Sequence, residues 1–243
     1  VYLTGNPQIT FFKVVYRRHT NFSKECIAQQ FTGSAAFGSS VSCTLARNGD
    51  LVQEIYLRAT MKCTVKQNND VFRLDDVTSL IKTVEVEIGG QKIDKHYSQW
   101  LDIYNELFET SHDYRAVMNS GSGTIANATS APVDSKDVTV YIPLRFWFNR
   151  NPGLALPLIA LQYHEVKVNV TFGTNNDLRA ALATQGGGTT VLNQLPGAVT
   201  VETGSEVAAG GDTAQHVAGR VGVALSTADL LVNYLYLDTD ERR

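Results

Sequence analysis

The chain has 243 residues, of which 43% are hydrophobic and 19% are charged, and its formal net charge is −3. This length is enough to bury a sizeable core, as one large β domain or two small ones would. Because phosphate binding requires clustered Lys and Arg in excess, the charge argues against a protein that neutralises nucleic acid directly.

The cysteines and the apolar stretches exclude further classes. Cys26, Cys43 and Cys63 are far apart, and no Cys-x-x-Cys or Cys/His cluster accompanies them, so we expect neither a disulfide framework nor a zinc site. They are interpreted as buried thiols in a reducing compartment. The longest apolar stretch, 154–161, is far shorter than the roughly 20 residues that a bilayer requires. The opening residues lack the pattern of a secretory signal.

The first clear strand pattern covers residues 54–66, where apolar and polar side chains alternate. A period of two predicts a half-buried strand with one face on a core. Residues 84–88 and 91–93 flank Gly89 and Gly90. This arrangement predicts a tight β-hairpin, because glycine readily adopts the positive φ angles of such a turn.

The segment 96–108 departs from the strand pattern. Its large apolar residues recur at helical spacing, namely Trp100, Leu101, Tyr104, Leu107 and Phe108. This spacing predicts a short amphipathic helix that covers a sheet.

Three later segments again predict strands. Alternation over residues 138–148 and 166–172 is typical of sheet faces packed on a core. Residues 230–237 are apolar on both faces, which indicates a strand inside a sheet, covered by another layer of protein, and not an edge strand.

Two segments predict long loops, because 110–137 and 175–219 are rich in small and polar residues and poor in large apolar ones. Many short strands joined by long excursions favour the all-β class. A jelly-roll β-sandwich with long loops and a short covering helix accounts for these features.

Catalytic signatures are missing from the sequence, which has no phosphate-binding loop, nucleophile elbow or zinc-protease motif. The adjacent His164 and Glu165 are the best candidates for acid–base chemistry. On a strand, however, neighbouring residues point to opposite faces, so a structural role for His164 is favoured. We therefore expect no enzyme, no catalytic or metal-binding residues and no cofactor.

A carbohydrate-binding or attachment module built on a β-sandwich is the alternative function. Its support is a small group in the first predicted loop, His112, Asp113 and Tyr114. Among the Asn-x-Ser/Thr sequons, only Asn127 lies in a segment whose composition suits a glycan, so it is a possible glycan site.

Five runs of the sequence carry a resemblance that composition does not explain. They are Leu3–Phe22, Arg47–Leu51, Glu87–Tyr97, Pro152–Val166 and Tyr236–Arg243. These runs resemble, in order, the major capsid proteins of nucleocytoplasmic large DNA viruses of the chlorovirus and iridovirus type. The loops between them do not visibly match.

The resemblance implies a structural major capsid protein. In that family each chain carries two tandem jelly rolls, and three chains form a capsomer of pseudo-hexagonal outline that tiles an icosahedral shell. On this basis residues 23–243 form the first jelly roll of a double jelly roll, the second is absent from this chain, and residues 1–22 form a segment at the capsomer base. The resemblance places in this assembly segment Asn6, Pro7, Phe11, Phe12, Tyr16, Arg17 and Arg18.

The resemblance also implies partners and a location. The partners would be two more copies of the chain, neighbouring capsomers and minor capsid proteins, in the capsid of a virion assembled in the host cytoplasm. The densest basic group, 13–19, is interpreted as a solvated segment rather than a nucleic-acid arm, so no direct contact with nucleic acid is expected. An internal membrane would be reached only through other proteins.

Overall fold

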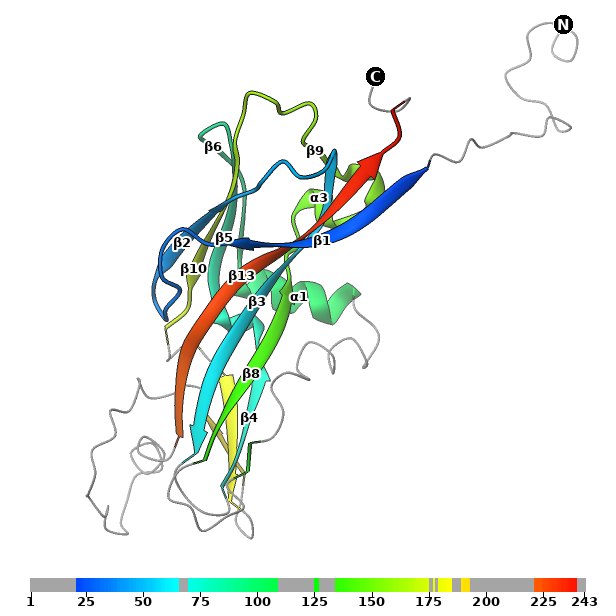
Figure 1. Ribbon diagram of the computed structural model, residues 1–243. Coiled ribbons are helices and arrows are strands. Elements are labelled where there is room, and N and C mark those ends of the chain that lie inside the picture. Colours follow the sequence, from blue (N-terminus) through cyan, green and yellow to red (C-terminus); the bar gives the residue numbers. More distant parts are fainter. Residues whose placement is uncertain are drawn as a thin grey trace, which may run out of the picture.

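The computed structural model describes residues 21–65, 70–108, 125–126, 134–174, 177, 179–184, 189–192 and 221–239. Two antiparallel sheets enclose one hydrophobic core (Figure 1). The first sheet has the order β1 (Phe22–Gln30), β13 (Val221–Leu237), β3 (Leu51–Val65) and β8 (Asp134–Pro143), and β9 (Leu156–Pro157) also pairs with β3. The second has the order β2 (Ser40–Thr44), β10 (Val166–Phe172), β5 (Ile81–Ile88) and β6 (Gln91–Tyr97).

The order of the strands identifies the topology. Leaving aside the two-residue β9, the facing sheets use β1, β2, β3, β5, β6, β8, β10 and β13. The first sheet holds the first, eighth, third and sixth of these strands, and the second sheet holds the second, seventh, fourth and fifth. The chain therefore crosses repeatedly between the sheets, as in a jelly roll. The predicted all-β fold class is confirmed.

The core consists of the side chains that alternate inward along each strand. Residues 55, 57, 59, 61 and 63 of β3 are buried, and so are residues 166, 168, 170 and 172 of β10. Both strands are predicted correctly, because the period of two brings every second apolar residue to the core. The hairpin at Gly89 and Gly90 is also confirmed, since both residues have positive φ angles, 59° and 83°.

The prediction of two uninterrupted loops is wrong in part. A third, smaller sheet has the order β12 (Thr189–Leu192), β11 (Arg179–Thr184), β4 (Asp70–Asp76) and β7 (Ile125–Ala126). Three of its strands, and the start of β8, fall inside the expected loops. Their small residues give no hydrophobic period, and pairing of β11 with β4, which is distant in sequence, supplies the missing order.

The strand predicted over 138–148 ends early, at Pro143. It is followed by the short helix α3 (Trp147–Arg150), whose first turn is held by the Asn149 side chain: its Oδ1 accepts from the Phe146 N–H at 3.1 Å, and its Nδ2 donates to the Gln53 carbonyl at 2.9 Å. Phe146 and Phe148 are buried, so the prediction that they face the core is correct. The prediction that they belong to a strand is wrong.

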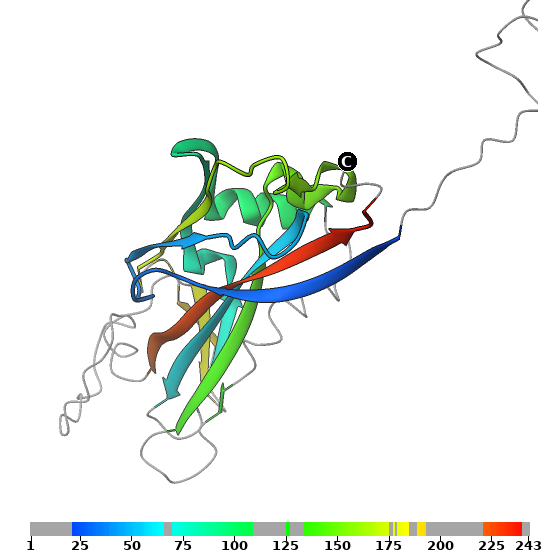
Figure 2. The ribbon, with the colours of Figure 1, turned by 45° about the horizontal axis from the view of Figure 1, so that its top comes forward.

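The predicted covering helix is confirmed as α1 (Ser98–Phe108), although His96 and Tyr97 belong to β6. α1 packs beside β5, β6 and the short helix η1 (Thr78–Leu80), and both ribbon views place it behind the first sheet (Figures 1 and 2). Leu101 is the buried residue of its inner side.

The prediction that all three thiols are buried is wrong for Cys26. Cys43 and Cys63 are buried in the core, whereas Cys26 is exposed. The reason is the position of β1, an edge strand in which every residue is exposed or partly exposed.

β13 lies between β1 and β3, as the prediction of a strand inside a sheet requires. Its pairs define the two ends of the sandwich. Phe22 pairs with Leu237 at what we call the terminal end, and Val221 and Asp134 both pair with Val65 at the opposite, loop end. The outward face of β13 is partly covered, because Asn233 is 9% exposed and donates to Glu54 at 2.8 Å.

Candidate assembly surfaces

All five family-like runs have described residues, and backbone pairing or hydrogen bonds connect each run to another. Asp50 is the junction between three of the runs. Its N–H donates to the Leu235 carbonyl at 2.9 Å, its carboxylate accepts from the Leu237 N–H at 2.8 Å, and its carbonyl accepts from the Ile159 N–H at 3.2 Å. One residue thus ties β13 to the chain around β9.

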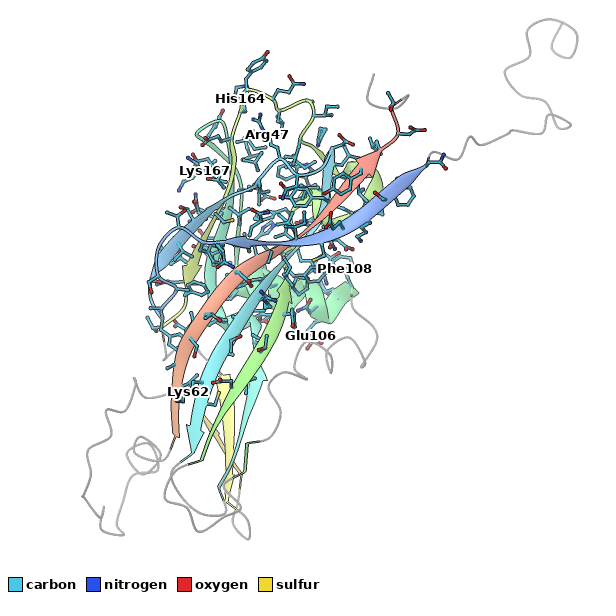
Figure 3. The ribbon with its side chains drawn as sticks, viewed as in Figure 1. Arg47, Lys62, Glu106, Phe108, His164 and Lys167 are labelled. Carbon is cyan, nitrogen blue, oxygen red and sulfur yellow. The ribbon has the colours of Figure 1, made fainter. Side chains whose placement is uncertain are left out.

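Arg47 fixes the turn that precedes β10. Its guanidinium donates to the carbonyls of Leu161 at 2.8 Å and of His164 at 3.0 Å, and also to that of Gln162 (Figure 3). Charge-assisted bonds to three carbonyls of one turn hold the turn in a single shape. That turn presents Tyr163, whose side chain is 93% exposed, at the molecular surface.

The run Glu87–Tyr97 is connected to the run Pro152–Val166 through Gly89, whose N–H donates to the Glu165 carbonyl at 2.9 Å. The His164 ring lies so close that a Cβ on Gly89 would stand 2.7 Å from its Nδ1. Glu165 instead forms an ion pair with Lys167 at 3.2 Å. The expected strand geometry for His164 is wrong, because β10 begins only at Val166 and His164 lies in the turn. His164 and Glu165 thus engage different neighbours.

The outward face of the first sheet carries paired charges. Lys24 of β1 forms an ion pair with Glu54 of β3 at 2.9 Å, and Arg58 of β3 forms a bidentate pair with Asp229 of β13. On the second sheet, Glu85 accepts from Lys92 and Lys95 at 2.7 and 2.9 Å, and these two contacts lower the pKa of the Glu85 carboxyl. Ion pairs therefore link side chains on the outward faces of both sheets.

Two arginines from the chain around α3 lie against the aromatic rings of α1, and no sequence pattern predicted them. Arg145 stands over the Tyr104 ring at 4.7 Å, and Arg150 stands 5.7 Å from the Trp100 ring. The Tyr104 and Phe108 rings are 4.7 Å apart. The spacing of rings at 100, 104 and 108 was the available signal, since residues four apart share a helix face.

Beside α1, a pocket of about 730 Å³ is lined by residues that include Lys82, Tyr97, Gln99, Asp102 and Asp177. Within the described part of the chain, no group of three or more His, Cys, Asp or Glu side chains could hold a metal ion. Nor do the described residues include a helix that is long and apolar enough to cross a membrane.

Several predicted site residues lie outside the described residues. They are the assembly segment residues Asn6, Pro7, Phe11, Phe12, Tyr16, Arg17 and Arg18, the possible glycan site Asn127, and the carbohydrate-loop group His112, Asp113 and Tyr114. Their roles stay predictions.

Comparisons of the sequence and of the structure both match this chain to viral capsid proteins. The family model described as "Major capsid protein N-terminus" matches residues 10–238. The whole chain aligns with the major capsid protein of Pyramimonas orientalis virus at 47% identity and with that of Paramecium bursaria Chlorella virus 1 at 40% identity, covering 51% and 46% of those proteins. The chain therefore spans about half the length of the curated relatives it matches.

Solved structures agree in fold. A chain of the PBCV-1 virus capsid matches with a TM-score of 0.59 at 35% identity, over 96% of this chain and 46% of that one. The Faustovirus major capsid protein matches with a TM-score of 0.62 over 96% of this chain and 57% of that one; at 13% identity, this second likeness concerns the fold alone.

Proposed function

This chain belongs to the major capsid protein N-terminus family, and on that basis we propose that it is the amino-terminal jelly roll of a structural major capsid protein of a large double-stranded DNA virus. The observation that carries the proposal is the interleaved strand order of the two sheets, found in a chain that aligns over its whole length with such proteins. The carbohydrate-binding alternative has no comparable support.

In this proposal the longer polypeptide forms a homotrimer. The relatives are about twice as long as this chain, so a protomer has room for a second domain of similar size. Two jelly rolls in each of three copies give six similar bodies, which produces a pseudo-hexagonal capsomer able to tile an icosahedral shell. Residues 23–243 form the first jelly roll.

Residues 1–22 form the assembly segment at the capsomer base. Support comes from β1, which begins at Phe22 on the terminal end with a side chain that is 67% exposed. A large exposed apolar side chain at the start of an edge strand is suited to contact with a neighbouring chain.

The partners in this proposal are neighbouring capsomers and minor capsid proteins, and the role is structural rather than catalytic. The ion pairs on the outer faces suit contacts that depend on geometry more than on apolar burial. Assembly in the host cytoplasm is supported by three free thiols, Cys26, Cys43 and Cys63, which suit a reducing compartment.

Light scattering tests the proposal. Residues 1–243 alone and the longer polypeptide are each purified, and the mass in solution is measured. The longer polypeptide should be a stable trimer, whereas residues 1–243 should not form one. A longer polypeptide that stays monomeric at micromolar concentration would contradict the proposed function.

A further inference from the structure

α1 exposes three large apolar side chains beside the polar Gln99 and Glu106. Ile103, Leu107 and Phe108 are 49%, 66% and 61% exposed. Ile103 and Leu107 are four residues apart and share a helix face, while Leu101 is buried on the other side. We call Ile103, Leu107 and Phe108 the α1 ridge; Figure 3 labels Phe108 at its end.

One flank of the ridge has the composition of an interface core. It is formed by Trp100 and Tyr104, with Arg145 and Arg150 stacked against their rings. Aromatic residues and arginine are the types enriched at the centres of protein interfaces. A solitary exposed leucine would need no explanation, but three large exposed apolar side chains on one short helix do.

The flank is also held in place before any partner binds. Arg150 Nε donates to the Arg145 carbonyl at 3.1 Å, and His96 lies against Phe146 with ring centroids 4.9 Å apart while its Nε2 is 3.0 Å from that carbonyl. Side chains that are ordered in advance lose less entropy on binding. The arginine flank beside the ridge is therefore ordered in advance of any contact.

The position of the end of β13 indicates which partner covers it. Leu237 bonds to Asp50, and Asp50 bonds to Ile159 just after β9. Both ribbon views place this end of β13 beside α3, whose Arg150 stacks on α1 (Figures 1 and 2). A polypeptide that continues from the end of β13 therefore starts beside α3, and α3 in turn contacts α1.

The relatives have such a continuation, because the matched family model is an amino-terminal one and this chain covers about half of their length. We infer that the α1 ridge is the docking surface for the carboxy-terminal half of the same polypeptide. This inference rests on the proposed function only in requiring that second half. The proposed contact is within one chain. The alternative is that a second copy of the chain covers the ridge.

Cross-linking in the longer polypeptide separates the two occupants. Leu107 is replaced by a photo-crosslinking phenylalanine analogue, and the same replacement at Ile93, which is 51% exposed on β6, is the control. After illumination, the product from position 107 should keep the mass of a single chain on a denaturing gel and contain a link to residues beyond Arg243. Position 93 should give no such link.

A product of doubled mass would overturn the inference, because a second copy would then cover the ridge. A lack of any link beyond Arg243 would overturn it as well. If the polypeptide does not trimerise but the link stays within one chain, the inference stands and the proposed capsomer is wrong. The two failures are thus distinguishable.

A pair of variants gives an independent readout. Ile103→Ser/Leu107→Ser should leave the unfolding midpoint of residues 1–243 unchanged, since both side chains are exposed there. In the longer polypeptide, amide exchange across 98–108 should be at least tenfold faster in this variant than in Ile93→Ser/Tyr163→Ser. Equal exchange rates in the two variants would overturn the inference.

Discussion

Gly49 lies directly against Tyr234, so that a Cβ on Gly49 would stand 2.8 Å from the Cβ of Tyr234 and 3.1 Å from the Leu235 carbonyl oxygen. The Tyr234 hydroxyl in turn donates to the Ala46 carbonyl at 2.7 Å. The loop before β3 is therefore fitted closely onto β13, and this contact explains why a glycine is needed in the run Arg47–Leu51.

Gly49→Ala should destabilise the domain by about 1–3 kcal/mol, because the added methyl group overpacks a contact formed by β13 itself. Gly153→Ala is the matched control, since the nearest atom to its Cβ would be the Asn151 side-chain oxygen at 3.4 Å. Urea unfolding measures both. A Gly49→Ala unfolding midpoint equal to that of the control would show that β13 accommodates the added methyl group without loss of stability.

Gly89→Ala should lower the free energy of unfolding more than Gly90→Ala does. Both residues have positive φ angles, so both substitutions strain the backbone. Only at Gly89 does the new Cβ also meet the His164 ring, at 2.7 Å, whereas nothing lies within 4 Å at Gly90. His164→Ala should remove the excess cost in a double-mutant cycle. If the changes in unfolding free energy caused by Gly89→Ala and His164→Ala are additive, the ring contact has no energetic role.

Thiol reactivity should separate the three cysteines. Burial raises the pKa of the Cys43 thiol to about 11 and that of the Cys63 thiol to about 12, so both stay protonated at pH 8 and are shielded from reagents. Cys26 is exposed on β1. A maleimide should therefore modify one thiol rapidly in the native protein and three after denaturation, and Cys26→Ser should abolish the rapid phase. Rapid modification of that variant would disprove the assignment.

The Glu85 network should make stability depend on pH in one direction. Lys92 and Lys95 lower the pKa of the Glu85 carboxyl, so its contribution is complete above the ordinary value of 4.5 and is lost as the pH falls through the lowered value. Because both lysines are largely exposed, Glu85→Gln should cost no more than about 1 kcal/mol at pH 7.

The difference in unfolding free energy between Glu85→Gln and the parent should shrink as the pH falls below 4.5. Glu87→Gln is the control, because Glu87 bonds to the Asn169 amide rather than to a lysine. A difference for Glu85→Gln that grows on acidification would contradict the assigned network.

The parts of the fold that the sequence predicted are those with a strong hydrophobic period. β3, β10 and α1 were predicted because each buries one face, and the hairpin after Ile88 was predicted because two glycines mark its turn. β1 gave no such signal, since as an edge strand it buries little. The third sheet depends on pairing between segments distant in sequence, which no local pattern encodes.

The candidate surfaces were predicted less completely. The family-like runs were recognised, but their convergence on Asp50 depends on the register between β13 and β3, which becomes visible only in three dimensions. The stacking of Arg145 and Arg150 on α1 depends on the turn from β8 into α3, where a continuous strand had been predicted.

Electron microscopy of the longer polypeptide tests whether this domain is one of two jelly rolls in each protomer of a trimeric capsomer. We expect a particle with three-fold symmetry and six similar lobes, in which the two sheets of this domain fit three of the lobes with the loop end and the terminal end at opposite faces. A particle with only three lobes, or one in which this domain fits none of the lobes, would contradict this expectation.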